Sequence, residues 1–440
     1  MNIAVNGHPI QLVVEDDFHR NRLTVFFRLL LAIPHIIWFF LWSIAALIVG
    51  ILNWFATLVM GQPPRGFHRF LCRYVRYSVH LSAYLYLLGN PYPGFMGEAG
   101  EYPVDIALPE EPQPQSRWKT LLRLILAIPA FVIGSVLGGG FGIPIGGFAY
   151  RGGSRRSNGY RGDFGGGGLL AAICAFLGWF ASLVTGRMPS GLRDAGAYGI
   201  GYGAQVRAYT LLLTDRYPNS DPTTMLESAP RPTAHPVHLV GEAHDLRRSR
   251  LTVFFRLPLF IPHYVWLYLW GYAAFVVGVL NWFATLIMGR PPRTFHRFLS
   301  AYIRYQFHVY AFATVAANPF PGFTGKAGSY PLDLALPAEP QRQNRWKTAF
   351  RVILVIPAWL VALGLTFALF FASIFTWFVA LVRGSAPWGL RNLMAYALRY
   401  LGQANAYLFL ITDRYPHASP LEGEKQQPPQ PQELEFSPVA

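Results

Sequence analysis

The sequence predicts an all-α integral membrane protein built from four repeated helical hairpins, with amphipathic interfacial helices and short extramembrane strands. Of its 440 residues, 52% are hydrophobic and 13% are charged, whereas soluble domains carry roughly 25% charged residues. Residues 22–61 form an apolar run with one charge, Arg28, after the opening arginine. Nearly the same run recurs 228 positions later, at Arg250–Gly289. The chain is therefore an internal duplication in an apolar setting.

Three stretches are long enough to cross a bilayer. They lie around Ile36–Met60, Leu259–Met288 and Val352–Val382, and each reaches the roughly 20 apolar residues that a spanning helix needs. The polar N-terminus shows no basic region followed by a short apolar core, so the first membrane segment is expected to be retained.

Each half contains a second level of repetition. Leu122–Pro129 echoes Phe27–Pro34 at an offset of 95, and Arg351–Pro357 echoes Arg256–Pro262. The common skeleton is an arginine, four residues, Ile-Pro, an apolar span, Trp-Phe, a glycine, and a closing Asn/Asp-x-Tyr/Phe-Pro turn. The Trp-Phe pairs begin at Trp54, Trp179, Trp282 and Trp377, and the glycines are Gly61, Gly186, Gly289 and Gly384. Such a period predicts tandem copies of one structural unit.

The predicted domains follow from these repeats. The first half is 1–218, with units 8–101 and 102–218 and a Gly-rich insertion at about 138–168; the second half is 235–416, with units 235–329 and 330–416. Residues 219–234 are predicted as a linker and 417–440 as a disordered tail, both too polar and Pro-rich to pack. Alternating segments that begin at Pro9, Pro103, Pro236 and Pro331 predict four strands, which could pair into a small extramembrane sheet.

The insertion suggests where each apolar run turns. Gly-rich backbone with four arginines needs water, and the equivalent position in the first unit falls near 42–49. We therefore expect a hairpin with arms at about Leu23–Trp42 and Ser43–Gly61, and roughly eight membrane segments in all. Arginines flank both ends of each hairpin, which places both ends, and both chain termini, on the cytoplasmic side. Full crossing and re-entry remain alternatives.

A third helix is predicted at Gly66–Leu88. Arg69, Arg73, Arg76 and His80 form one stripe along it, as in an in-plane interfacial helix. A membrane span is the alternative.

The skeleton resembles the bacterial membrane family called domain of unknown function 4389. The resemblance rests on the arginine-led helix with Ile-Pro, the Trp-Phe-Ala sequence, Gly-x-x-Pro-Arg-Gly-Phe at Gly61–Phe67, and a Tyr-rich helix ending in Asp-Arg-Tyr-Pro. It covers most of residues 8–416. It implies a multi-pass membrane protein whose activity is not established.

No residue pattern predicts catalytic chemistry, a cofactor or a metal site. His35, His68 and His80 recur as His263, His296 and His308, but the other two units have different residues there, so interfacial hydrogen bonding is favoured over metal or proton chemistry. Cys72 and Cys174 lie in different units and indicate neither a disulfide framework nor a zinc site. One arginine of each unit lies about 9 Å inside the first arm by helical rise: Arg28, Arg123, Arg256 and Arg351. These arginines are interpreted as snorkelling to headgroups, in preference to binding a buried substrate.

The predicted function is non-enzymatic: organising or binding anionic lipid, or serving as a scaffold, in the bacterial cell membrane. The net charge is +15. Its arginines flank the apolar runs, which favours anionic lipid over nucleic acid as the partner. Protein partners are not predicted. A channel or transporter with a path between the hairpins is the rival, and an enzyme acting on headgroups with His68 or His296 as base is a third candidate. The candidate headgroup contacts are Arg22, Arg28, Arg65, Arg69, Arg73, Arg76, Arg123, Arg250, Arg256, Arg293, Arg297, Arg304 and Arg351.

Overall fold

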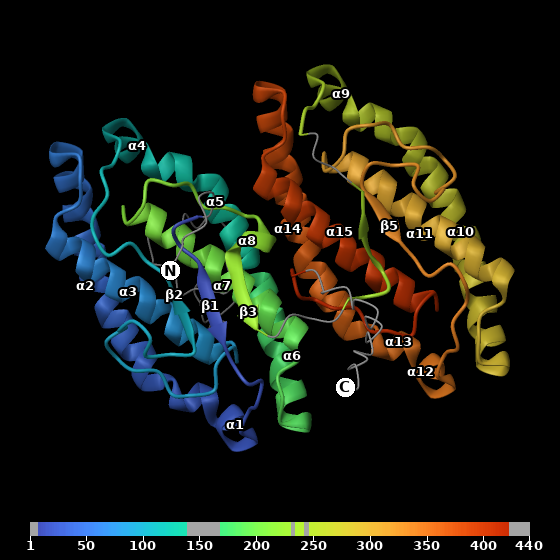
Figure 1. Ribbon diagram of the computed structural model, residues 1–440, viewed down its shortest axis with the longest axis horizontal. Coiled ribbons are helices and arrows are strands. Elements are labelled where there is room, and N and C mark those ends of the chain that lie inside the picture. The colour runs from blue at the N-terminus through green and yellow to red at the C-terminus, as the bar shows by residue number, and fades with distance from the viewer. Residues whose placement is uncertain (1–7, 139–167, 230–233, 242–245, 422–440) are drawn as a thin grey trace, which may run out of the picture.

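A computed structural model describes residues 8–138, 168–229, 234–241 and 246–421 (Figure 1). The Gly-rich insertion, apart from Gly138 and Gly168, and most of the predicted tail lie outside the described residues. The remainder is mostly helical, with a few short strands.

The first unit shows how the repeated skeleton folds. It contains β1 (Leu12–Glu15), α1 (Arg22–Leu31), α2 (Ile33–Met60) and α3 (Arg65–Leu85). Ala32 keeps helical dihedral angles, with φ −78° and ψ −13°, so α1 and α2 form one apolar rod of 39 residues. The rod ends at Gly61, whose φ of +77° is the left-handed conformation usual after a helix. The chain then reverses into α3, which packs along α2.

The other units repeat this order. The second has β2 (Val104–Ile106), α4 (Arg117–Leu121), α5 (Arg123–Leu137), α6 (Leu169–Thr185), α7 (Ser190–Thr210), α8 (Pro222–Met225) and β3 (Leu226–Ala229). The third has β4 (His238–Val240), α9 (Arg250–Phe254), α10 (Arg256–Met288) and α11 (Arg293–Ala313). The fourth has β5 (Asp333–Ala335), α12 (Arg345–Ala349), α13 (Arg351–Leu354), α14 (Ile356–Arg383) and α15 (Trp388–Leu408).

The predicted hairpin is wrong. Helix α2 passes without a break through Trp42 and Ser43, where the turn was expected, and the Ser43 hydroxyl donates within the helix to the carbonyl of Phe39. The run has no Gly, Pro, Asn or Asp at this point to form a turn. In the second unit the insertion divides the corresponding helix into α5 and α6. The insertion thus marks where this helix can be interrupted, not where the others turn.

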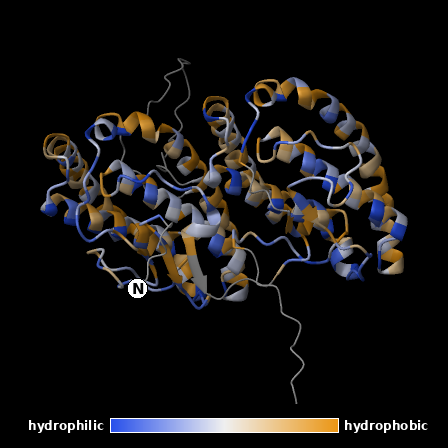
Figure 2. Cartoon of the chain, turned by 45° about the horizontal axis from the view of Figure 1, so that its top comes forward, coloured by the Kyte–Doolittle hydropathy of each residue, from blue (hydrophilic) through white to orange (hydrophobic). Residues whose placement is uncertain are grey.

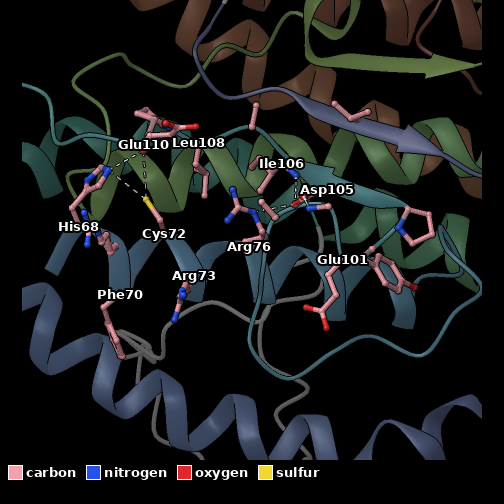
Figure 3. Close-up of a pocket in the computed structure, with 18 of the residues that line it drawn as sticks. His68, Phe70, Cys72, Arg73, Arg76, Glu101, Asp105, Ile106, Leu108 and Glu110 are labelled. Atoms are coloured by element: carbon pink, nitrogen blue, oxygen red, sulfur yellow. Dashed lines mark hydrogen bonds and ion pairs between the residues drawn. The ribbon is translucent and has the colours of Figure 1, made fainter. Parts of the chain in front are cut away.

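Apart from the short helices α4, α8 and α12, the described helices form two classes, stacked in layers with the strands. The long helices are α1–α2, α5, α6, α9–α10 and α13–α14, and the returning helices are α3, α7, α11 and α15. The strands pack against the returning helices, which pack in turn against the long helices. Figure 3 shows α3 between the strands and α2, and Figure 1 shows α2 and α10 at the two ends of the row.

The long helices expose large apolar side chains, and α2 and α10 bury several polar ones. Large side chains such as Phe40, Phe55 and Val59 are 56–75% exposed, whereas the buried face of α2 includes Ser43 and Asn53. Figure 2 shows the hydrophobic residues along the outward-facing long helices. Soluble helices have the reverse pattern, so these faces indicate contact with lipid.

Within the part of the chain that the structure describes, three helical segments are long and apolar enough to cross a membrane: Arg22–Met60, Arg256–Met288 and Arg351–Arg383. The prediction of about eight membrane segments is therefore wrong for the described residues. The 39-residue rod is also about 58 Å long by helical rise, nearly twice the ~30 Å hydrocarbon thickness.

The predicted third helix is present as α3, but it does not lie alone at an interface. Leu71, Tyr74 and His80 are completely buried, because α3 packs against α2, α7 and β2.

All four predicted strands are present, but they form two sheets instead of one. In the first half the order is β2-β1-β3, and in the second β4 pairs with β5. β3 lies in the segment predicted as a linker and pairs in parallel with β1, so the expectation that residues 219–234 do not pack is wrong for Pro222–Ala229. The first tail residues also pack, since Ala418 and Ser419 are buried.

Candidate functional site

Each of the four units has one buried arginine, in the first part of its apolar run, that caps a returning helix. The Arg28 side chain is 2% exposed, and its Nη1 donates to the carbonyls of Tyr84 at 2.7 Å and Gly89 at 3.1 Å. Its guanidinium lies 4.5 Å from the centre of the Tyr84 ring. Unpaired carbonyls and the negative dipole end at the C-terminus of α3 stabilise a cation there. The equivalent arginines with the same contacts are Arg123, Arg256 and Arg351.

The interpretation of these four arginines as snorkelling to headgroups is wrong. Their exposed fractions are 0–2%, because carbonyls of the same unit surround each guanidinium before it can reach lipid. The acceptors come from a segment 56 to 61 residues later in the chain for Arg28, Arg256 and Arg351, and 86 to 91 residues later for Arg123.

The Trp-Phe motifs join the two units of each half. The Trp54 indole donates to the carbonyl of Thr120 in the second unit at 2.8 Å, and Trp179 donates back to Val25 at 3.2 Å. Trp282 and Trp377 make the same reciprocal contacts with Thr348 and Val253 in the second half. Each half is thus an interlocked pair of units. Sequence reasoning missed Thr120 and Thr348, although their recurrence at the offset of 228 was an available signal.

A groove of about 1410 Å³ lies along α3 in the first half. Its lining includes Arg69, Arg73 and Arg76, opposed by acidic residues such as Glu101. Figure 3 shows Arg73 on the side of α3 that faces α2, whereas Arg76 points to the strands. The groove therefore lies at the level between the apolar layer and the strand layer.

Asp105 fastens β2 to α3 at the strand side of this groove. It accepts hydrogen bonds from His80 at 3.1 Å and from the amides of Gly100 and Ile106, both at 2.7 Å, and Arg76 lies 3.2 Å away. Burial alone would raise the pKa of the Asp105 carboxyl, but the hydrogen bonds outweigh it and hold the pKa below its ordinary value. The carboxylate therefore stays charged at neutral pH.

The same fastening recurs in the other units. In the second half Asp333 accepts from His308 at 2.7 Å. Glutamines occupy the equivalent helical position in the other two units: Gln205 donates to the carbonyl of Ile10, and Gln403 donates to that of Val237. This position ties a returning helix to a strand segment in all four units, which gives the histidines a structural role.

The three histidines of the first unit are not brought together. His35 bonds the Tyr77 hydroxyl at 2.8 Å, His68 donates from Nε2 to the carbonyl of Pro109 at 2.9 Å, and His80 bonds Asp105. Burial raises the pKa of the neighbouring Cys72 thiol to about 12, so it is neutral. Among the described residues no group of three or more His, Cys, Asp or Glu side chains is arranged to hold a metal ion.

The other predicted headgroup contacts fall into three groups. Arg22 and Arg250 donate to the carbonyls of Val184 and Val382 at the ends of long helices, and Arg76 and Arg304 point inward to Asp105 and Asp333. The remaining five are exposed: Arg65, Arg69, Arg73, Arg293 and Arg297.

The apolar long helices and the interlocked units define a membrane protein built from tandem repeats. The chain belongs to the family described as domain of unknown function (DUF4389), which matches residues 22–97, 165–220, 250–324 and 345–419. The predicted resemblance and its four tandem copies are thereby confirmed. No curated protein and no solved structure matches the chain.

Proposed function

We propose that this chain is a non-enzymatic protein of a bacterial cell membrane that binds and organises anionic lipid, with both termini on the cytoplasmic side. The observation that carries the proposal is the place of its exposed arginines. Arg69 and Arg73 project from α3, and Arg297 projects from α11, between the apolar layer and the strand layer. Cationic side chains at this level meet the headgroups when the apolar layer is in lipid.

The order of the layers favours long helices that lie parallel to the membrane surface over long helices that cross the membrane. Strands and loops lie beside α3, which runs along α2, so an upright α2 would carry strand edges into the bilayer, where unpaired backbone groups are not tolerated. Keeping a ~58 Å apolar rod inside ~30 Å of hydrocarbon would also need a tilt of about 60°, beyond the usual range. Lying along one leaflet buries the whole apolar face and keeps both arginine-bearing ends at one surface.

The two ends of the α1–α2 rod are therefore expected on the same side of the membrane. Single cysteines at His19→Cys and Gln62→Cys, both exposed positions, flank the rod and can be placed in a variant that lacks Cys72 and Cys174. Both cysteines should resist an impermeant maleimide in intact spheroplasts and react once the membrane is opened. Labelling of only one of them in intact spheroplasts would show that α2 crosses, and would revive a transport path.

Neutralising the exposed arginines should weaken the preference for anionic lipid. We expect Arg69→Gln/Arg73→Gln/Arg297→Gln to lose about fivefold in relative affinity per arginine, since each cation near the surface contributes about 1 kcal/mol. The measurement is the ratio of phosphatidylglycerol to phosphatidylcholine retained by the protein purified from mixed vesicles.

The matched control replaces the same three arginines with lysine. Charge is kept and only the guanidinium fork is lost, so this variant should retain most of the preference. Equal lipid ratios in the wild-type, glutamine and lysine proteins would contradict anionic lipid binding by this surface.

A further inference from the structure

A second cavity, of about 1200 Å³, lies between the two halves of the chain. One wall comes from α5, with Leu126, Pro129 and Ile133, and the other from α14, with Phe375 and Phe378. Leu126 and Phe378 are 42% and 57% exposed on the apolar surface. The cavity is therefore a crevice that opens into the lipid-facing layer.

One end of this crevice is polar and cationic. Lys119 near the start of α4, Arg216 in the turn after α7 and Arg383 at the end of α14 all line it, with Asp215 as the opposing carboxylate. Asp215 is held by two cations, Lys119 at 2.8 Å and the buried Arg123 at 3.0 Å. His8 adds no charge at neutral pH, because burial lowers its pKa to about 4.

We propose that this crevice binds one anionic phospholipid, with its headgroup at Lys119, Arg216 and Arg383 and an acyl chain between α5 and α14. The inference deepens the proposed function and rests on it, because the crevice opens to lipid only if the long helices lie in a membrane. An apolar slot with cationic side chains at one end matches the two parts of such a lipid. This proposed site encloses the acyl chain and contacts the headgroup, whereas the exposed arginines of α3 and α11 contact the headgroup alone.

The repeated sequence supplies a matched pair of positions for the test. Phe378 on α14 and Phe283 on α10 follow the tryptophan of their Trp-Phe motifs and are 57% and 54% exposed, but only Phe378 is among the residues that line this crevice. A photoreactive benzoylphenylalanine at either position, in the full chain in vesicles of equal phosphatidylglycerol and phosphatidylcholine, reports the local lipid composition.

We expect phosphatidylglycerol to be enriched about fivefold in the crosslinks at Phe378 relative to those at Phe283, the effect of one cation near an anionic headgroup. Arg383→Gln, which removes one of the three cations at an exposed position, should lower this enrichment, and Val379→Trp should block the crevice and lower the crosslinking yield at Phe378. The equivalent Ala284→Trp on α10 should leave the yield at Phe283 unchanged.

Equal lipid ratios at Phe378 and Phe283 would overturn the crevice site, as would enrichment that is undiminished in Arg383→Gln. Neither result affects the proposed function if Arg69→Gln/Arg73→Gln/Arg297→Gln still loses its preference for anionic lipid. Loss of enrichment at Phe378 together with unchanged retention in that triple variant would reject both.

Discussion

Replacing Arg351 with methionine is expected to lower the free energy of unfolding by about 3–5 kcal/mol. Its Nη1 donates to the carbonyls of Tyr407 at 3.1 Å and Thr412 at 3.2 Å, and its Nη2 donates to Gln343 at 2.7 Å and Asp413 at 3.0 Å. Methionine removes all four hydrogen bonds and takes the donor from the Thr412 carbonyl and the Gln343 amide oxygen, and each buried, unsatisfied polar group costs about 1–3 kcal/mol. The loss is measurable by denaturant titration in detergent, followed by tryptophan fluorescence.

A buried ion pair can sometimes be replaced by apolar residues without loss of stability, but only when all partners are changed together. Here the partners include backbone carbonyls, which no substitution removes. The control is Arg345→Met, which removes one exposed hydrogen bond, to the carbonyl of Ile287 at 2.9 Å, and should cost about 1 kcal/mol. Equal losses in the two variants would show that burial of the Arg351 guanidinium contributes nothing beyond a surface contact.

The repeat unit could be predicted because the same residue types recur at fixed spacings along the sequence. The offsets of 228 and 95 identified three recurring features as a set: the arginines now found buried, the glycines that end the long helices, and the Trp-Phe motifs. Gly61 and Gly289 adopt the left-handed conformation at matching helix ends, with φ +77° and +73°, as their place after each apolar run predicted.

The partners of the Trp-Phe tryptophans and of Gln205 could not be predicted, because they lie in other units. Trp54 bonds Thr120, 66 residues away, and Gln205 bonds Ile10, 195 residues away. Periodicity reports which face of a helix is apolar, but it does not report which neighbour covers a given position. The lipid crevice is a stronger case, since its walls belong to α5 and α14, in different halves of the chain.

The predicted hairpin was wrong for a different reason. The prediction placed a turn in α2 at the position equivalent to the insertion between α5 and α6, although the residues at Trp42 and Ser43 do not favour a turn. Local residue chemistry was the better guide there, and it favoured a continuous helix. The consequence is large, because a continuous 39-residue helical segment places its two ends far apart and changes the orientation expected in the membrane.

Helix α7 offers a second large effect, at a contact where two backbones touch. A Cβ atom added at Gly199 would lie 2.3 Å from the carbonyl oxygen of Leu137, at the end of α5. Because this neighbour is backbone, it cannot rotate away, and α5 or α7 must move. We expect Gly199→Ala to lower the free energy of unfolding by about 3 kcal/mol, the upper part of the range for overpacking.

Gly203, one turn later on α7, is the matched control for this steric effect. A Cβ there would meet only the flexible end of Arg207, at 3.9 Å, so Gly203→Ala should raise stability by up to about 1 kcal/mol through helix propensity. The two variants make the same chemical change in the same helix, and a difference in sign between them isolates the α5–α7 contact. If both substitutions stabilise the protein, α5 does not end against α7. Helix α5 would then not be in position to form one wall of the lipid crevice.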